Sequence, residues 1–103
     1  MAIMHLTIIP LGTQTTSLGK FVAEIRKTLE VAGVPFQLTD MGTIIEGDSR
    51  DLLELAGRLA ELPFKNGVQR VVTQISLDDR RDKKISLGDK TASVAARLKS
   101  PDE

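Results

Sequence analysis

The chain has 103 residues, of which 41% are apolar, and fourteen basic residues balance fourteen acidic ones. A chain of this length supports one modest core, so we expect a single domain over residues 1–103. Net neutrality argues against binding to nucleic acid or to an anionic membrane through bulk charge. The absence of cysteine excludes disulfides, thiolate nucleophiles and thiolate metal sites.

The first ten residues are apolar but include His5 and Thr7 and carry no basic segment, which is not typical of a signal peptide. No apolar run approaches the roughly 20 residues of a membrane-spanning helix. We therefore expect a cytoplasmic protein that does not enter a membrane.

Residues 3–10 alternate apolar and polar side chains, which predicts a half-buried strand that ends at Pro10. Apolar residues then recur at helical spacing over residues 18–32, with Ser17 suited to cap the start and Gly33 to stop the end. The first third of the chain thus predicts a strand followed by a helix.

Residues 34–40 and 43–47 are two short segments of strand character joined tightly at residues 41–42, which is typical of a hairpin. A leucine-rich helical stripe follows, with a capping residue at 48–49 and a stop at residues 66–67. The middle third therefore predicts strand, strand and helix.

Residues 70–78 read as a fourth strand, with Val71, Ile75 and Leu77 toward the core. The mixed-charge block 78–83 follows; it is either a solvated turn or a surface on which arginines pair with carboxylates of another subunit. After it, Ser86-Leu87-Gly88-Asp89 has the pattern of a capping box and predicts a short final helix.

The order strand, helix, strand, strand, helix, strand is the split βαβ pattern of the α+β, ferredoxin-like fold. We expect a four-stranded antiparallel sheet with two helices on one face and a short C-terminal helix besides. The other sheet face would stay open and mostly polar, a natural place for self-association. Its expected residues are His5, Thr7, Gln37, Thr39, Val72, Gln74 and Ser76.

Few residues are of a type and spacing that suggest catalysis or ligand binding. His5 is the only histidine and has no carboxylate or histidine nearby in sequence, so a plain strand position accounts for it better than a metal site. The hydroxyl run Thr13, Thr15, Thr16 and Ser17 could hold an anion at a helix N-terminus, although plain capping, which needs one of these hydroxyls, explains it as well. Glu46, near Thr43 and next to a glycine, could hold a heterocycle's ring nitrogen and amine, or be an ordinary exposed glutamate; the residues leave both open. We expect no catalytic residue, metal or cofactor.

Three segments, in matching order and spacing over nearly the whole chain, resemble the small thiamine-binding protein family. They are Ile9-Pro10-Leu11-Gly12-Thr13 with Thr16-Ser17, Met41-Gly42-Thr43-Ile44-Ile45-Glu46-Gly47, and Asp78-Asp79-Arg80-Arg81-Asp82-Lys83 followed by Lys90. The resemblance implies a cytoplasmic ferredoxin-like subunit that forms dimers and tetramers. It also implies non-catalytic binding of thiamine or of its hydroxymethylpyrimidine part.

On this resemblance, Glu46 and Thr43 would meet the aminopyrimidine, with Thr16 and Ser17 as further ligand-binding residues. Because Tyr and Trp are absent, either Phe21 or Phe36 would supply a π-face for the cationic thiazolium, or an apolar wall of Ile and Met would take its place. The alternative is a structural or regulatory module that binds a protein partner through its open sheet face.

Overall fold

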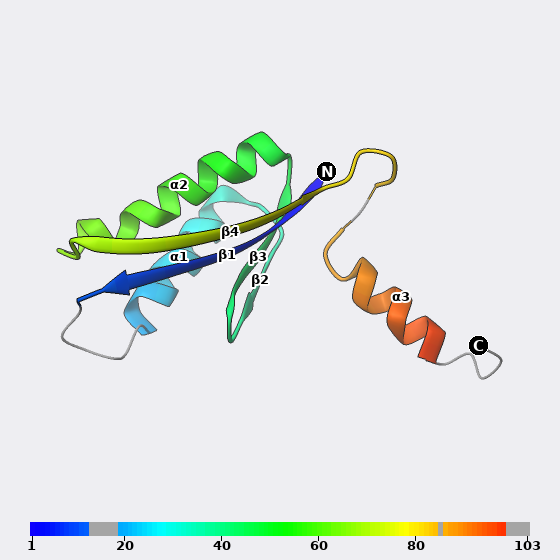
Figure 1. The fold of residues 1–103 in the computed structure, drawn as a ribbon, viewed down its shortest axis with the longest axis horizontal. Helices are drawn as coiled ribbons and strands as arrows, with labels where there is room; N and C mark the ends of the chain where they lie inside the picture. The colour runs from blue at the N-terminus through cyan, green and yellow to red at the C-terminus, as the bar shows by residue number, and fades with distance from the viewer. Residues whose placement is uncertain (13–18, 85, 99–103) are drawn as a thin grey trace.

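The computed structural model describes residues 1–12, 19–84 and 86–98. Figure 1 shows two helices packed against a sheet and a third helix beyond it. The elements are β1 (Ala2–Leu11), α1 (Gly19–Ala32), β2 (Phe36–Thr39), β3 (Gly42–Gly47), α2 (Ser49–Lys65), β4 (Arg70–Asp79) and α3 (Asp89–Leu98). The predicted α+β, ferredoxin-like order is confirmed.

The sheet has the strand order β2-β3-β1-β4, and all its pairs are antiparallel. β1 pairs with β3 from Ala2 opposite Gly47 to Leu6 opposite Thr43. It also pairs with β4 along its whole length, from Ala2 opposite Asp79 to Leu11 opposite Arg70. Because side chains alternate along a strand, these registers decide which residues face the helices.

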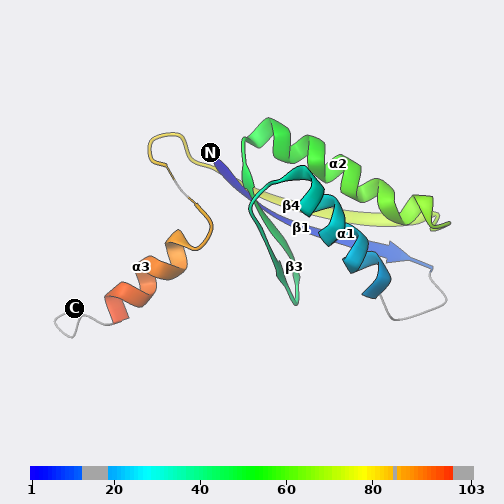
Figure 2. The same cartoon turned by 180° about the vertical axis from the view of Figure 1, so that it is seen from behind.

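The core lies between the sheet and the helices α1 and α2, which cover the same sheet face (Figures 1 and 2). Its apolar residues come from alternate positions of β1 and β3 and from the inner stripes of the helices. The buried set is Ala2, Met4, Leu6, Ile25, Leu29, Ile45, Leu52, Leu55, Ala56 and Leu59. The alternation and helical periods of the sequence predicted this division of faces.

Two helix ends follow local chemistry. The Asp48 carboxylate accepts a hydrogen bond from the amide of Arg50 at 3.0 Å and caps α2. Gly33 has a φ of +71°, and its amide donates to the carbonyl of Leu29 at 3.1 Å, which ends α1 in the left-handed conformation that glycine favours. The proposed cap of α1, Ser17, lies outside the described residues.

Some residues that the apolar pattern of the sequence places in the core are only partly buried in the structure. Ile75 faces the helix side of the sheet, opposite Leu6, yet 45% of it is exposed. Val22 of α1 is 44% exposed. β4 is the outer strand of the sheet, so Ile75 has a neighbouring strand on one side only.

α3 stands apart from the sheet and the other helices (Figures 1 and 2), and none of its residues is buried. Lys90 Nζ donates to Asp78 Oδ2 at 2.8 Å, which links the first turn of α3 to the end of β4. At the start of α3, the Asp89 carboxylate accepts from the Ser86 amide at 2.7 Å, as a capping box requires. No helix in residues 1–12, 19–84 and 86–98 is long and apolar enough to cross a membrane.

Candidate functional site

The turn between β2 and β3 is stabilised by hydrogen bonds of the Thr39 hydroxyl. Thr39 Oγ1 accepts hydrogen bonds from the amides of Met41 and Gly42, at 3.3 and 3.1 Å, and donates to the carbonyl of Gly42 at 2.9 Å. Thr7 Oγ1 donates to the carbonyl of Met41 at 3.3 Å, which ties this turn to the central strand β1. The position of Asp40, between these residues, is therefore set by the turn.

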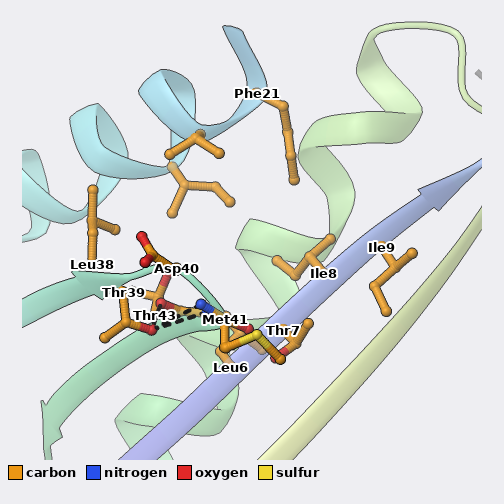
Figure 3. A pocket seen from close by; sticks show the side chains of 13 residues that line it. Leu6, Thr7, Ile8, Ile9, Phe21, Leu38, Thr39, Asp40, Met41 and Thr43 are labelled. Atoms are coloured by element: carbon orange, nitrogen blue, oxygen red, sulfur yellow. Dashed lines mark hydrogen bonds between the residues drawn. The ribbon is translucent and has the colours of Figure 1, made fainter. Parts of the chain in front are cut away.

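A cavity of about 250 Å³ opens between this turn, β1 and α1. Figure 3 shows the side chains that line it, with Phe21 on α1, Ile8 and Ile9 on β1, and Asp40 on the hairpin. The lining residues are Leu6, Thr7, Ile8, Ile9, Phe21, Val22, Ile25, Leu38, Thr39, Asp40, Met41, Gly42 and Thr43. Its size is just under the roughly 300–1,000 Å³ of most small-molecule sites, which suits a small ligand.

The cavity combines apolar walls with a few polar groups, a combination common to small-molecule sites. The walls come from aliphatic side chains and half-buried Phe21. The one ionisable lining residue is Asp40, which is exposed and makes no ion pair or hydrogen bond with the described residues through its side chain. A cationic ring system would bury its rings against the walls and place its charge near this carboxylate.

The structure separates the two residues that the sequence assigned to one site. Thr43 lies opposite Leu6 on the helix side of the sheet, is 6% exposed and lines the cavity. Glu46 lies opposite Ile3, three positions further along β3 and so on the other face, where it is 8% exposed. Within one chain, a ligand in the cavity meets Thr43 and does not meet Glu46.

The other predicted site residues divide as follows. Thr16 and Ser17 lie outside the described residues. Of the two candidate phenylalanines, Phe21 lines the cavity, whereas Phe36 packs against the core. Asp40 was not singled out from the sequence, although its place at the tip of a predicted hairpin was a signal that it would be exposed.

The charged residues at the end of β4 and just after it form ion pairs with one another. Arg80 Nε donates to Asp82 at 2.8 Å, and Arg81 donates to Asp79, with the shortest contact at 2.9 Å. The hydrogen bonds from Arg81 lower the pKa of the Asp79 carboxyl, and those from Arg80 lower the pKa of the Asp82 carboxyl. These residues therefore neutralise one another within the chain and offer less charge to a ligand than the sequence alone indicates.

Comparison with known proteins places the chain among small proteins of similar length. The family described as thiamine-binding protein matches residues 4–95. The UPF0045 protein YqgV of Bacillus subtilis is 45% identical over 102 residues, which cover 95% of this chain and 98% of that protein. A UPF0045 protein of Methanothermobacter thermautotrophicus is 37% identical over 99 residues, which cover 95% of this chain and all of that protein.

Solved structures agree on the fold. Protein MJ1052 of Methanocaldococcus jannaschii superposes with a TM-score of 0.81 at 26% identity, over 91% of this chain and 95% of that one. A Thermotoga maritima protein, named for a suggested role in thiamine biosynthesis or salvage, superposes with a TM-score of 0.73 at 15% identity, over 90% of this chain and 97% of that one. By sequence match over most of its length, the chain belongs to the thiamine-binding protein family.

Proposed function

We propose that this protein binds thiamine, or a related aminopyrimidine, in the cavity between α1 and the β2–β3 turn, without catalysing a reaction. The observation that carries the proposal is the pairing of an apolar, Phe21-lined cavity with the Asp40 carboxylate, in a chain of the thiamine-binding family. Thiamine has one neutral aminopyrimidine ring and one cationic thiazolium ring. The apolar walls would cover one ring, and Asp40 would offset the charge of the other.

In this proposal Thr43 is the polar contact at the inner end of the cavity, where it is 6% exposed. Its hydroxyl can donate to a ring nitrogen or accept from an exocyclic amine. Thr16 and Ser17, just before α1 in sequence, remain proposed ligand-binding residues. Glu46 would serve a ligand on the opposite sheet face, which requires a second copy or another partner to enclose it.

The polar groups of the cavity support binding rather than turnover. The hydroxyl protons of Thr39 and Thr7 are donated to backbone carbonyls, which occupies them in holding the turn. No histidine or lysine lies among the lining residues to act as a base toward Thr43. We therefore propose a binding protein that does not catalyse a reaction. On the resemblance alone, we propose further that it acts in the cytoplasm as a homodimer or homotetramer.

Calorimetry with thiamine and with hydroxymethylpyrimidine tests the site directly. Asp40→Asn should weaken thiamine about tenfold or more, because a charge-assisted contact is lost, and should leave the neutral pyrimidine nearly unaffected. Thr43→Val should weaken both ligands. Glu46→Gln is the control on the opposite face and should change neither.

The outcomes separate the alternatives. A loss confined to Glu46→Gln would move the site to the open sheet face, and absence of heat with both ligands at millimolar concentration would overturn the binding function. Turnover of a thiamine-like compound that depends on Asp40 would overturn the non-catalytic reading.

A second candidate, the interaction module, is favoured by one feature of the open face. Ile9, which also lines the edge of the cavity, and Val72 lie directly opposite each other there and are each 37% exposed. Pairing of two exposed apolar side chains suits contact with another protein surface. Replacement of Val72 by Asp should abolish capture of such a partner and leave ligand binding intact, whereas unchanged capture would count against this use of the face.

A further inference from the structure

The central strand β1 is longer than the hairpin strand that pairs with it. On one side, residues 2–11 all pair with β4. On the other side, only residues 2–6 pair with β3, because the hairpin turns back there. Among the described residues, the far part of β1 therefore has a neighbouring strand on one side only. Figure 3 shows Ile8 and Ile9 on this part, beyond the turn and beside the cavity.

The direction of the backbone groups along β1 follows from the ladder. In an antiparallel pair, opposite residues alternately exchange two hydrogen bonds and none, so successive residues direct their N–H and C=O to opposite sides. The Glu46 amide donates toward the chain before β2, so Thr43, an odd number of residues away, faces β1 and its partner Leu6. The Leu6 oxygen accordingly lies only 2.7 Å from where a Cβ of Gly42 would be. Ile8, two residues after Leu6, points its N–H and C=O to the same side, which is the cavity side.

The N–H and C=O of Ile8 have no backbone partner within residues 1–12, 19–84 and 86–98. Thr73 lies opposite Ile8 on β4, but by the alternation this pair exchanges no hydrogen bonds. Pro10, the next residue with the same direction, has no N–H, and proline in a sheet is typical of an unpaired edge. Ile8 thus offers the cavity one donor and one acceptor, which need a partner when a ligand displaces water from them.

The two groups of Ile8 match one edge of an aminopyrimidine. In an extended residue the N–H and C=O lie side by side and point the same way. An aminopyrimidine carries a ring nitrogen that accepts a hydrogen bond beside an amino group that donates one. Such a ring could exchange two hydrogen bonds with Ile8, as a residue of a neighbouring strand would. Thr43 lines the same cavity and can contact the other ring nitrogen, while Asp40 lies there for the cationic ring.

We infer that the unpaired edge of β1 selects the aminopyrimidine, with the Ile8 N–H donating to a ring nitrogen and the Ile8 C=O accepting from the exocyclic amine. This inference rests on the proposed function, because it concerns how the same cavity recognises its ligand. It assigns the selectivity for an amino group to the main chain of Ile8. The site therefore rejects a ring in which an oxo group replaces the amine.

Oxythiamine is the probe for this selectivity, because it differs from thiamine by an oxo group in place of the amino group. Its ring nitrogen beside the oxo group carries a hydrogen, so donor and acceptor exchange places. The Ile8 N–H would then face an N–H, and the Ile8 C=O would face an oxygen. Turning the ring over would restore the pairing but carry the thiazolium away from Asp40. Calorimetry should show oxythiamine binding about a hundredfold more weakly than thiamine.

Replacement of Ile8 by proline removes the donor itself. Because the Ile8 N–H points away from β4, Ile8→Pro takes no hydrogen bond from that ladder. It should weaken thiamine about tenfold or more and reduce the preference over oxythiamine from about a hundredfold to about tenfold. Ile8→Val is the matched control, since valine is close to proline in size and keeps the N–H. It should change the affinity by less than about threefold and leave the preference intact.

Amide hydrogen exchange of the wild-type chain, followed by NMR, tests the edge without any substitution. The Ile8 amide should exchange fast in the free protein and at least about tenfold more slowly with saturating thiamine. The Ile9 amide is the internal control, because it points to β4 opposite Val72 and should exchange slowly in both states. Slow exchange of Ile8 in the free protein would show that the edge is already paired and would overturn the inference.

The outcomes also separate this inference from the proposed function. Thiamine that binds with full heat, while oxythiamine binds equally well and Ile8 exchange stays unchanged, would overturn the role of the β1 edge and leave the binding function standing. Absence of heat with thiamine would overturn both. Weak oxythiamine binding, together with ligand-dependent protection of Ile8 and not of Ile9, would establish the contact.

Discussion

Gly42 leaves room for His5 where β3 passes β1. A Cβ atom at residue 42 would lie 2.6 Å from His5 Nε2 and 2.7 Å from the backbone oxygen of Leu6. The imidazole could rotate away from such a methyl group, but the backbone oxygen of the central strand cannot move without disturbing the sheet. Glycine at this position therefore permits the hairpin turn beside the cavity to lie close to β1.

Gly42→Ala should destabilise the protein by about 1–3 kcal/mol, the usual cost of overpacking, and should weaken ligand binding through the displaced turn. Urea denaturation measures the first effect. Gly57→Ala is the matched control, since nothing lies within 4 Å of a Cβ at this exposed position inside α2. It should stabilise by up to about 1 kcal/mol through helix propensity; equal effects from the two variants would contradict the steric account.

Leu59→Ala should cost about 2–5 kcal/mol, because Leu59 is fully buried between α2 and the sheet and its truncation leaves a cavity. Leu98→Ala makes the same chemical change on a helix residue that is 82% exposed, and should cost almost nothing. The difference in urea midpoint between the two variants measures how much the burial of Leu59 contributes to the stability of the fold. A small loss from Leu59→Ala would show that the core can collapse around the missing atoms.

The sequence predicted the fold well because its signals are local. Alternation over residues 3–10 and the helical stripe of α2 each follow from the side chains themselves, and the register then places Met4 and Ile45 in the core. The placement of Thr43 and Glu46 on opposite sheet faces could also have been predicted from the sequence, since an odd spacing on a strand puts two residues on opposite faces.

Other features depend on what lies next to an element in space. Ile75 has the pattern of a core residue, and its 45% exposure follows from the outer position of β4 in the sheet. The place of Asp40 at the cavity follows from packing of the hairpin turn near α1, which joins residues far apart in sequence. Local periodicity predicts neither the exposure of Ile75 nor the position of Asp40.

Asp79 should titrate below its ordinary pKa of 3.8, because Arg81 holds its carboxylate with short hydrogen bonds. A carboxyl whose pKa is depressed on folding contributes stability above its unfolded pKa, and that contribution is lost as the pH falls through the folded pKa. Arg81→Ala should therefore raise the pKa of Asp79, and its stability deficit should vanish at pH values below the folded pKa.

Carbon-detected NMR of the side-chain carboxyls measures these pKa values. Asp82 is the internal control, since Arg80 lowers its pKa and the Arg81→Ala change leaves that pair intact. If Asp79 titrates identically in both proteins, the Arg81 contact is not populated in solution.

α3 should exchange its amide hydrogens far faster than α2 when the chain is monomeric. It has ten residues and none is buried, and isolated helices shorter than roughly 12–15 residues are marginal in water. Its link to the body is the exposed pair of Lys90 and Asp78, and such surface pairs contribute about 0–1 kcal/mol. In contrast, α2 buries Leu52, Leu55 and Leu59 and opens only with most of the core.

Hydrogen exchange followed by mass spectrometry distinguishes the two helices within one sample. Asp78→Asn removes the charge that Lys90 contacts and should accelerate exchange in α3 only slightly, with α2 unchanged. Protection of α3 comparable to that of α2 would mean that its apolar stripe of Val94 and Leu98, 56% and 82% exposed, packs against another surface. Dilution then identifies that surface, because protection that fades at low protein concentration comes from a second copy and protection that persists comes from the same chain.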